Sequence, residues 1–361
     1  MASVLQSCAE REVMNELEPI PDTVPQFPIS FGGELAGEES AVTRADQTLG
    51  QDFFLYGYKT LADNSRPAVF PKYTVYFGPG TAGSTEDNTH NYYYVKPENN
   101  QFIKYWDYSA SEYRFWGYIP HKSMYPDDDD DFISPSNGGQ TLTIKGLAIS
   151  IKEPQNYLVS MPNVVPNTEF GNTVQMRFVH PYAKVRVMIY SGEKLVSSDK
   201  VRLSDISFGP EDPSKKIVSA ETIQIDYPLS GSTEEKYSIL INPSTPYKDK
   251  FSYRALDLTS DHCTSNTAAA AIPDEADATL ADQYYYVLPT GTGVAAPDFK
   301  LSMTFNNETR TAIVPAAYMH WKPNYSYTYI FKISDGTLLF VDAKIVEWQS
   351  GGSASETWTN W

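Results

Sequence analysis

Residues Thr173–Tyr190 read TVQMRFVHPYAKVRVMIY and lie near the middle of a chain of 361 residues. The first half of this stretch places Val174, Met176 and Phe178 at alternate positions, so all three face one side of an extended chain. The alternation resumes after Pro181. Alternating β-branched and aromatic residues predict a half-buried strand, and a proline predicts a bend, a bulge or a sheet edge because it cannot donate to the ladder. We therefore expect a kinked strand that resumes and opens a second system of sheets.

The composition favours an all-β protein. The chain has 26 Tyr, 17 Phe and 6 Trp, and its 25 Pro and 21 Gly supply many turns. Aromatic and β-branched segments between such turns are typical of sandwiches and barrels. Short strands are predicted throughout the first half of the chain, at Phe27–Leu35, Phe53–Tyr58, Tyr73–Phe77, Tyr92–Val95, Ile103–Tyr108, Tyr113–Tyr118 and Thr141–Ile151. The length suffices for two domains, each with its own core.

The net charge, the cysteines and the lengths of the apolar runs exclude several classes of protein. The formal net charge of -17 argues against a nucleic acid or an anionic lipid surface as the partner. The cysteines, Cys8 and Cys263, are far apart in the sequence, which argues against a disulfide framework. No apolar run reaches the length of about 20 residues that a membrane-spanning helix requires.

Three sequence features could indicate a binding or catalytic site, but none has the full pattern that such a site requires. Gly78–Gly83 matches G-x-G-x-x-G, but Pro79 interrupts it and no helical pattern follows, so we expect a turn rather than a dinucleotide site. Asp127–Asp131 lacks the alternating ligands of a calcium loop and is predicted to be a solvated loop. The 5 histidines contain no i, i+4 pair, and no nucleophile elbow or carboxylate pair stands out. We therefore expect no catalytic residue, no cofactor and no metal.

The strongest strand pattern comes near the end of the chain. After Trp321, one face of a predicted strand carries Tyr325, Tyr327, Tyr329, Phe331 and Ile333. Asp335-Gly336 then predicts a hairpin turn into Leu338–Val346. Another hairpin is predicted from Phe299–Phe305 to Thr311–Val314. Aromatic cross-strand pairs stabilise any sheet, so the tyrosine ladder is interpreted as structural, with a sugar-binding platform as the alternative.

The N-terminal residues Leu5–Cys8, LQSC, are similar to the lipobox of bacterial lipoproteins, in which a small residue precedes a cysteine that becomes lipidated. Cys8 is therefore the candidate lipidation site. An incidental cysteine in a flexible terminus is the other interpretation, since no basic segment and no long apolar segment precedes it. Residues 9–27 are acidic and contain several prolines, which is typical of a flexible tether.

Several stretches together resemble the FimA/Mfa-like fimbrillins, the type V pilins on the surface of certain anaerobic Gram-negative bacteria. The first-domain signature is matched by Val69–Phe77 and by Tyr105–Tyr108 with Tyr113–Pro120. The segment F-x-H-x-x-A-K, which leads into the second domain, is matched by Met176–Val187. The closing hairpin is matched by Trp321–Tyr329 with Val346–Trp348. The likeness spans roughly residues 27–350. The chain departs from the pattern at Pro181, which follows His180.

The resemblance implies an all-β fold of two transthyretin-like Greek-key β-sandwich domains in tandem. On this basis the chain divides into a lipoprotein leader and tether, an N-terminal domain, a C-terminal domain and a tail, at residues 1–26, 27–172, 173–348 and 349–361. The resemblance also implies export as a lipoprotein, anchoring in the outer membrane through Cys8, and assembly with other pilin subunits into a fimbria at the cell surface. Adhesion and biofilm formation would then follow indirectly.

In such pilins an arginine-specific protease cuts after an arginine downstream of the first strand, and Arg44 is the matching position here. The cut would release the first strand, in which Ile29, Phe31 and Leu35 alternate. A sheet that lacks a strand exposes unpaired backbone groups and apolar pockets, which an extended segment of a neighbouring chain can fill. Head-to-tail donation of this kind does not close and therefore yields a filament.

The candidate donor segment is C-terminal. It starts at Val346 and Trp348, passes through a Ser-Gly-Gly-Ser hinge, and ends near Trp358 and Trp361. An ordinary terminal strand with a frayed tail is the other interpretation, and the polar run Ser353–Glu356 weighs against a donor. A different function also stays open at this point, that of a surface-exposed lipoprotein which binds glycans through exposed Trp and Tyr side chains.

Overall fold

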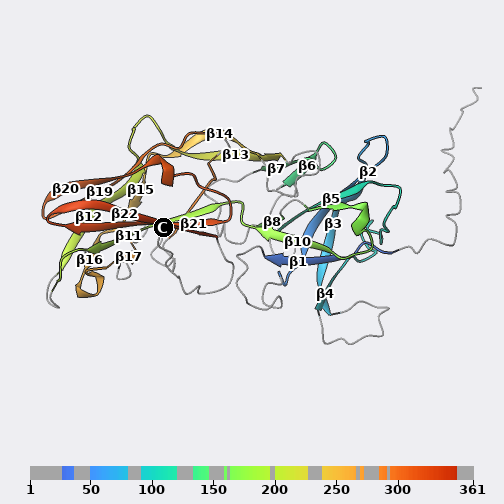
Figure 1. Cartoon of the computed structure of the whole chain (residues 1–361), viewed down its shortest axis with the longest axis horizontal. Helices are drawn as coiled ribbons and strands as arrows, with labels where there is room; N and C mark the ends of the chain where they lie inside the picture. The colour runs from blue at the N-terminus through green and yellow to red at the C-terminus, as the bar shows by residue number, and fades with distance from the viewer. Residues whose placement is uncertain are drawn as a thin grey trace, which may run out of the picture.

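The computed structural model describes residues 27–35, 49–79, 91–119, 133–145, 158–160, 163–195, 200–226, 238–265, 269–271, 284–290 and 293–347. Within these ranges the chain is almost entirely β, and its helical turns are short 3-10 segments at Asn167–Glu169, Ser260–His262 and Ala316–Tyr318. The all-β class predicted from the sequence is thus confirmed. Figure 1 shows two bodies of strands that follow one another along the long axis of the molecule. No helix in the described ranges is long and apolar enough to cross a membrane.

The first body is built on one sheet in the order β1-β10-β8-β5-β2-β3-β4, with β9 paired to β5. Its strands are β1 (Phe31–Leu35), β2 (Phe53–Thr60), β3 (Ala68–Pro79), β4 (Asn91–Tyr94), β5 (Glu112–Ile119), β8 (Leu158–Ser160), β9 (Asn163–Pro166) and β10 (Val174–Val179). The two outermost strands approach each other, because the side chain of Tyr93 in β4 reaches Gly33 in β1. The sheet therefore wraps around a core that contains Phe31, Phe70 and Phe115.

The second body consists of two sheets. One has the order β17-β11-β21-β22, with β18 paired to β11, and the other has the order β15-β12-β19-β20, with β16 paired to β12. Their strands are β11 (Ala183–Ser191), β12 (Val201–Pro210), β15 (Phe251–Tyr253), β16 (Leu256–Leu258), β17 (Ala270–Ala271), β18 (Tyr285–Val287), β19 (Phe299–Phe305), β20 (Glu308–Val314), β21 (Tyr325–Ser334) and β22 (Thr337–Glu347). Phe208 of one sheet contacts Tyr329 of the other, with 5.3 Å between ring centroids. The sheets thus pack face to face over a shared core, as in a sandwich.

A fourth sheet joins the two halves of the sequence. Its order is β14-β13-β7-β6, and its strands are β6 (Ile133–Ser136), β7 (Thr141–Lys145), β13 (Ile217–Asp226) and β14 (Ser238–Lys248). The antiparallel pairing of β7 with β13 runs from Thr141↔Asp226 to Lys145↔Thr222. These strands run between the two bodies along the upper side of Figure 1. A hairpin from the first half of the chain is therefore hydrogen-bonded to a hairpin from the second half.

The kink predicted in the central stretch is confirmed. β10 ends at Val179 and β11 begins at Ala183, on either side of Pro181. The pairing places β10 in the first sheet, beside β1 and β8, and β11 in the second body, parallel to β21. The change of sheet therefore comes after β10 and not at Thr173, where we expected the second system to open. Because hydrogen-bond pairing alone does not define a folding unit, the predicted division at residue 172 stays a prediction.

Asn324 fixes the crossover between the two bodies. Its side-chain oxygen accepts a hydrogen bond of 3.1 Å from the backbone nitrogen of His180, and its own backbone nitrogen donates to the carbonyl oxygen of Tyr182 at 2.9 Å. Asn324 has a φ of 66°, a left-handed conformation that asparagine adopts more readily than most residues. His180, Tyr182 and Asn324 are all buried. One residue just before β21 thus holds the backbone on both sides of the proline, through its side chain at His180 and through its own backbone at Tyr182.

The two predicted hairpins of the second half are confirmed, and one strand predicted for the first half is wrong. Asp335 and Gly336 have φ values of 49° and 68°, as the tight turn between β21 and β22 requires. Gly78, expected in a turn, instead pairs with Tyr92 as part of β3, while residues 80–83 lie outside the described residues. Ile103–Tyr108, expected to form a strand, makes only an isolated bridge between Tyr105 and Pro28.

Candidate functional site

The candidate site is the place that β1 occupies at the end of the first sheet. β1 runs parallel to β10, in a register from Phe31↔Val174 to Leu35↔Phe178. The backbone nitrogen of Val174 donates a hydrogen bond of 2.8 Å to the carbonyl oxygen of Ser30, just before the strand. Among the described strands, β10 is the only one paired with β1. β1 is therefore an edge strand, held by the ladder on one side alone.

Two side chains of this segment point into the core. Ile29 is 6% exposed and Phe31 is 5% exposed, and both belong to the hydrophobic cluster of the first body. The ring of Phe31 lies 5.5 Å from the ring of Phe70 and 5.5 Å from that of Phe115, in edge-to-face geometry in both cases. Burial of one such side chain contributes about 1.5–3 kcal/mol. Ile29 and Phe31 are therefore part of the core, and their role in a removable strand stays a prediction.

The backbone ahead of β1 is held by the segment that sequence analysis predicted as a strand. The backbone nitrogen of Ile29 donates to the carbonyl oxygen of Lys104 at 2.8 Å, and the backbone nitrogen of Trp106 donates to that of Phe27 at 3.2 Å. Trp106 is buried and stacks on Phe170 with 4.6 Å between ring centroids. The site of β1 therefore continues beyond the sheet along an anchored loop.

Tyr93 and Leu49 meet the same glycine of β1. The hydroxyl group of Tyr93 donates to the carbonyl oxygen of Gly33 at 3.4 Å, and the backbone nitrogen of Leu49 donates to that oxygen at 3.0 Å. The Tyr93 oxygen also accepts a hydrogen bond of 2.9 Å from the backbone nitrogen of Gly50. Burial raises the pKa of Tyr93 to about 12. The chain on both sides of residues 36–48 thus converges on Gly33.

Most of the other predicted site residues cannot be placed. Cys8, Arg44, Trp348, Trp358 and Trp361 lie outside the described residues. The same holds for Asp127–Asp131, whereas the backbone of Leu35 is placed opposite Phe178. Val346, the first residue of the candidate donor segment, lies in β22 and is 37% exposed.

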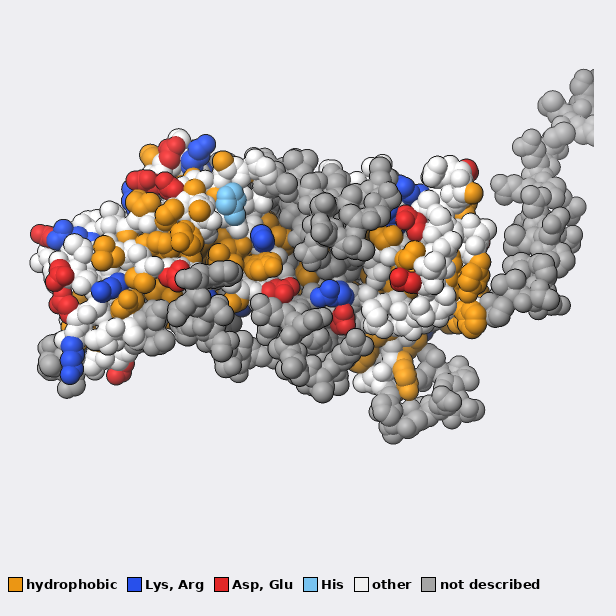
Figure 2. Space-filling model, in the orientation of Figure 1, with side chains coloured by type: hydrophobic (Ala, Val, Ile, Leu, Met, Phe, Trp, Pro, Cys, Tyr) orange, Lys and Arg blue, Asp and Glu red, His pale blue; other side chains and the backbone are white. Residues whose placement is uncertain are grey.

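β22 is the outermost strand of its sheet and presents apolar side chains to solvent. Leu339, Val341 and Ile345 are each more than two-fifths exposed. Figure 2 shows apolar side chains gathered on the face of the second body that this view presents. In the described part of the chain, β22 pairs with β21 alone. The segment that leads into the candidate donor is therefore itself an exposed sheet edge.

The tyrosine ladder of β21 is part of the core. Tyr327 is 1% exposed and Tyr329 is 0% exposed. The Tyr329 hydroxyl donates to the carbonyl oxygen of Tyr318 at 2.8 Å and accepts from the indole nitrogen of Trp321 at 3.0 Å. Burial raises the pKa of both tyrosines well above the ordinary value. Tyr327 and Tyr329 are therefore structural and do not present their rings to a sugar in solvent.

Sequence reasoning missed the walls of the β1 site. Phe115 and Tyr93 lie in predicted strands and Phe70 lies in a stretch that resembles the fimbrillins, but nothing in the sequence places them at β1; the loop around Lys104 is predicted as a strand. The signal that was present is the Gly32-Gly33 pair inside a strand pattern, because glycine in a strand marks a close approach of other groups. In the described residues, no three His, Cys, Asp or Glu side chains lie close enough together to hold a metal ion.

The comparisons with known proteins support the fold. No protein-family model matches the chain, and no curated protein matches it. A fimbrial protein from Bacteroides vulgatus superposes with a TM-score of 0.51 at 11% sequence identity, covering 90% of this chain and 100% of that one. Two further solved structures match with lower scores: a fimbrial assembly protein from Parabacteroides distasonis (TM-score 0.39, 12% identity, 90% and 100% covered) and the tip fimbrial protein Mfa3 from Porphyromonas gingivalis (0.36, 12%, 90% and 100%).

At this level of identity the likeness to the Bacteroides vulgatus structure concerns the fold alone. The chain has the fold of a fimbrial protein, and the resemblance inferred from its sequence motifs is confirmed to that extent.

Proposed function

We propose that the chain is a structural subunit of a cell-surface fimbria, which assembles by strand exchange once its first strand has been removed. The observation that carries the proposal is the construction of the β1 site. β1 is an edge strand with a single paired neighbour, yet Phe31 fills a pocket between Phe70 and Phe115. Loss of β1 would therefore expose both a free strand edge on β10 and an apolar pocket, the two features that capture an extended segment.

Proteolysis between the two ends of the 36–48 segment is the proposed trigger. Leu35 and Leu49 flank this segment, and Leu49 is hydrogen-bonded to Gly33. After a cut at Arg44, β1 would be held only by non-covalent contacts, while Leu49 and the rest of the first body would stay in place. We infer an arginine-specific protease as the partner in this step, and a second pilin subunit as the source of the replacement strand.

The remaining elements of the proposal follow from the fimbrial fold and from the leader. We propose domains at residues 27–172 and 173–348, a lipidated Cys8 in the leader 1–26, and a location at the outer membrane and cell surface. The donor would come from the C-terminal segment beginning at Val346 and including Trp348. Support for this choice is that Val346 lies near the end of β22, an exposed sheet edge that pairs with β21 alone among the described strands.

The test is controlled proteolysis of the purified full-length chain. An arginine-specific protease should cut after Arg44, release the N-terminal fragment, and convert the remainder into species whose size grows with protein concentration. Intact mass and size-exclusion chromatography read out both steps. The matched control is Arg44→Lys, which keeps the charge but removes the protease site. A product that loses the fragment and remains monomeric at every concentration would contradict assembly by exchange.

A further inference from the structure

Three glycines of the first sheet each lie against an aromatic ring from another strand. A Cβ atom on Gly57 would lie 2.6 Å from the ring of Phe70, and one on Gly117 would lie 3.0 Å from the ring of Phe178. A Cβ atom on Gly33 would lie 3.0 Å from both Cζ and the hydroxyl oxygen of Tyr93. At each of these positions a large ring takes the space that a side chain would need, which is how large and small residues interdigitate in a packed core.

Gly33 is the one of the three that belongs to the removable strand. Ile29, Phe31 and Gly33 alternate, and all three are buried, so Gly33 occupies an inward position of β1. The inward row therefore reads large, large, glycine, and the third place is filled from β4 by Tyr93. This is the arrangement in which an aromatic side chain on one edge strand covers a glycine on another.

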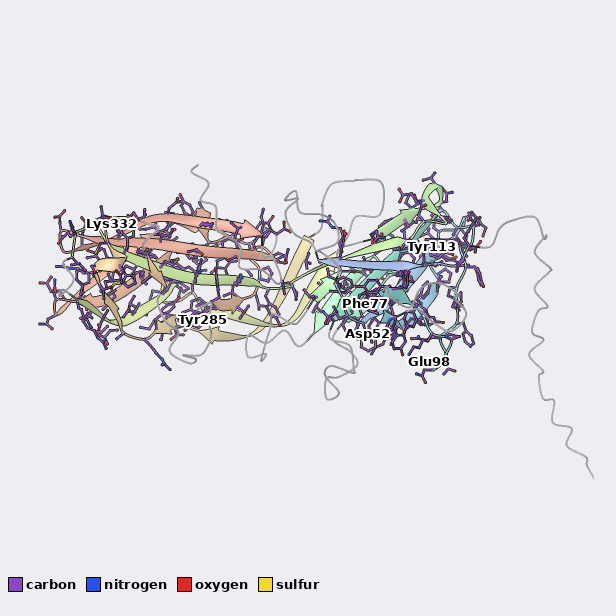
Figure 3. All side chains as sticks on the ribbon, turned by 90° about the horizontal axis from the view of Figure 1, so that it is seen from below. Asp52, Phe77, Glu98, Tyr113, Tyr285 and Lys332 are labelled. Atoms are coloured by element: carbon purple, nitrogen blue, oxygen red, sulfur yellow. The ribbon has the colours of Figure 1, made fainter. Side chains whose placement is uncertain are left out.

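Tyr93 has little room to move away. Its ring lies 4.8 Å from that of Phe77 and 5.7 Å from that of Phe53, and its oxygen accepts the hydrogen bond from Gly50. Phe77 is itself tied to the strand before it, because its backbone nitrogen donates to the carboxylate of Asp52 at 2.7 Å; both residues are labelled in Figure 3. A Cβ at Gly33 would therefore meet a supported ring and not a loose side chain.

Gly32 provides an internal comparison on the opposite face of the same strand. A Cβ there would meet the amide end of the Gln175 side chain. Gln175 is exposed, so its flexible side chain can turn into solvent. The obstacles at the two neighbouring glycines thus differ: at Gly33 it is a partly buried ring packed against the core and held by other groups, and at Gly32 it is a flexible side chain on the surface.

We propose that the β1 site is selective, and that a segment replacing β1 binds tightly only if it carries glycine at the place of Gly33 and a large apolar side chain at the place of Phe31. This inference rests on the proposed strand exchange and adds the sequence that the exchange accepts. It distinguishes the site from a generic sheet edge, which would accept many extended sequences through backbone bonds alone.

The candidate donor segment also contains a glycine pair. Besides Gly32-Gly33, the sequence contains Gly138-Gly139, which has φ values of 60° and 79° and forms the turn between β6 and β7, and Gly351-Gly352 in the tail. Placing Gly352 of a second copy at Gly33 puts Trp348 at the place of Ile29 and Ser350 at that of Phe31. Serine cannot fill the Phe70–Phe115 pocket, so the tail should bind more weakly than β1, and Ser350→Phe should strengthen it.

The experiment separates selectivity from exchange itself. A recognition sequence for a sequence-specific protease is placed within residues 37–47 of the full-length chain, so that β1 can be freed whatever the natural cleavage site. The cut protein is then titrated with fluorescent peptides that cover Phe27–Leu35, and binding is followed by anisotropy. The peptides are the natural sequence, Gly33→Ala, Gly32→Ala and Phe31→Ala, with a scrambled peptide as the baseline.

The expected result is ordered. Gly33→Ala and Phe31→Ala should each weaken binding at least about ten-fold, the scale of forcing extra atoms into a packed site or emptying one, whereas Gly32→Ala should change it by less than about three-fold. Tyr93→Ala in the cut protein should abolish the penalty of the Gly33→Ala peptide, and Tyr93→Phe should reduce it. A merely destabilised site would weaken all peptides alike and leave that penalty in place.

The outcomes assign failure to one proposal or the other. If the natural peptide does not bind and the cut fragment cannot be displaced, the exchange fails and the selectivity falls with it. If the natural and Gly33→Ala peptides bind equally well, exchange stands and the selectivity is overturned. Equal binding of tail peptides covering residues 344–356 with Ser350 and with Ser350→Phe would contradict the proposed register.

Discussion

The ring of Phe31 meets the ring of Phe115 edge to face, with 5.5 Å between the ring centroids. Phe31 precedes the proposed cleavage site, while Phe115 lies in β5, near the middle of the first sheet. One side chain thus links an edge strand with a single paired neighbour to the centre of the core. The stability of the first body and the ease of its opening should depend on the same residue.

Phe31→Ala should lower the free energy of unfolding by about 3–5 kcal/mol, because it removes a buried ring and leaves a cavity. It should also speed the loss of β1 after cleavage. Urea denaturation followed by tryptophan fluorescence measures the first effect. Glu34→Ala is the control in the same strand: Glu34 pairs with Arg177 at 3.3 Å, but both side chains are more than a third exposed, so a change within about 0.5 kcal/mol is expected.

Asn324→Ala should destabilise the second body by about 1–3 kcal/mol, since the buried backbone nitrogen of His180 would lose its acceptor. Asn324→Gly serves as the comparison, because glycine tolerates the φ of 66° but removes the same hydrogen bond. If the lost bond dominates, both variants should unfold at similar denaturant concentrations. A glycine variant as stable as the natural chain would show that backbone strain, and not the hydrogen bond, decides the effect.

Asp107 should make the loop that holds β1 sensitive to acid. Burial alone would raise the pKa of Asp107, but hydrogen bonds from Lys59 and Ser109 and the charge of Lys59 outweigh it and lower the pKa below the ordinary value. Folding therefore favours the carboxylate. Its contribution is fully present above the ordinary pKa of about 3.9 and is lost as the pH falls through the lowered value.

Asp107→Asn measures this contribution. The variant should be less stable than the natural chain at pH 7, by a modest amount because the pair is partly exposed, and the gap should close as the pH falls below about 3.9. Thermal melts of both proteins from about pH 2.5 to about pH 7, a range that includes the pKa, would measure the difference in stability. A stability difference between the two proteins that does not change with pH would show that packing, and not the charge of Asp107, causes it.

Local patterns in the sequence predicted the local parts of this fold. Asp335-Gly336 between two alternating runs predicted the closing hairpin, and Pro181 predicted the break between β10 and β11, because turn and proline chemistry act over a few residues. The strand predicted at Ile103–Tyr108 was wrong for a local reason that only the structure reveals. Asp107 accepts from Ser109 at 2.9 Å and its backbone oxygen accepts from Ala110 at 3.0 Å, so the chain turns where a strand would have continued.

The non-local parts could not be predicted in this way. The parallel pairing of β1 with β10 joins Phe31 to Val174, and the pairing of β7 with β13 joins Thr141 to Asp226. Alternation says which face of a strand is buried but not which strand lies beside it. The pocket for Phe31 needs rings from β3 and β5 together, so it exists only once the sheet has formed. For the same reason the glycine at position 33 indicates that another group comes close, but the sequence does not show that this group is Tyr93.

A reversible lock on β1 tests the central claim most directly. The side-chain oxygens of Ser30 and Thr173 lie 3.0 Å apart, so Ser30→Cys with Thr173→Cys should form a disulfide between the β1 segment and the residue before β10. With Cys8→Ser in the background, the oxidised protein should be cut after Arg44 yet keep the fragment and stay monomeric. Adding a reductant should then release the fragment and start concentration-dependent assembly. Assembly of the oxidised, cut protein at the rate of the reduced one would contradict the removal of β1 as the step that opens the site.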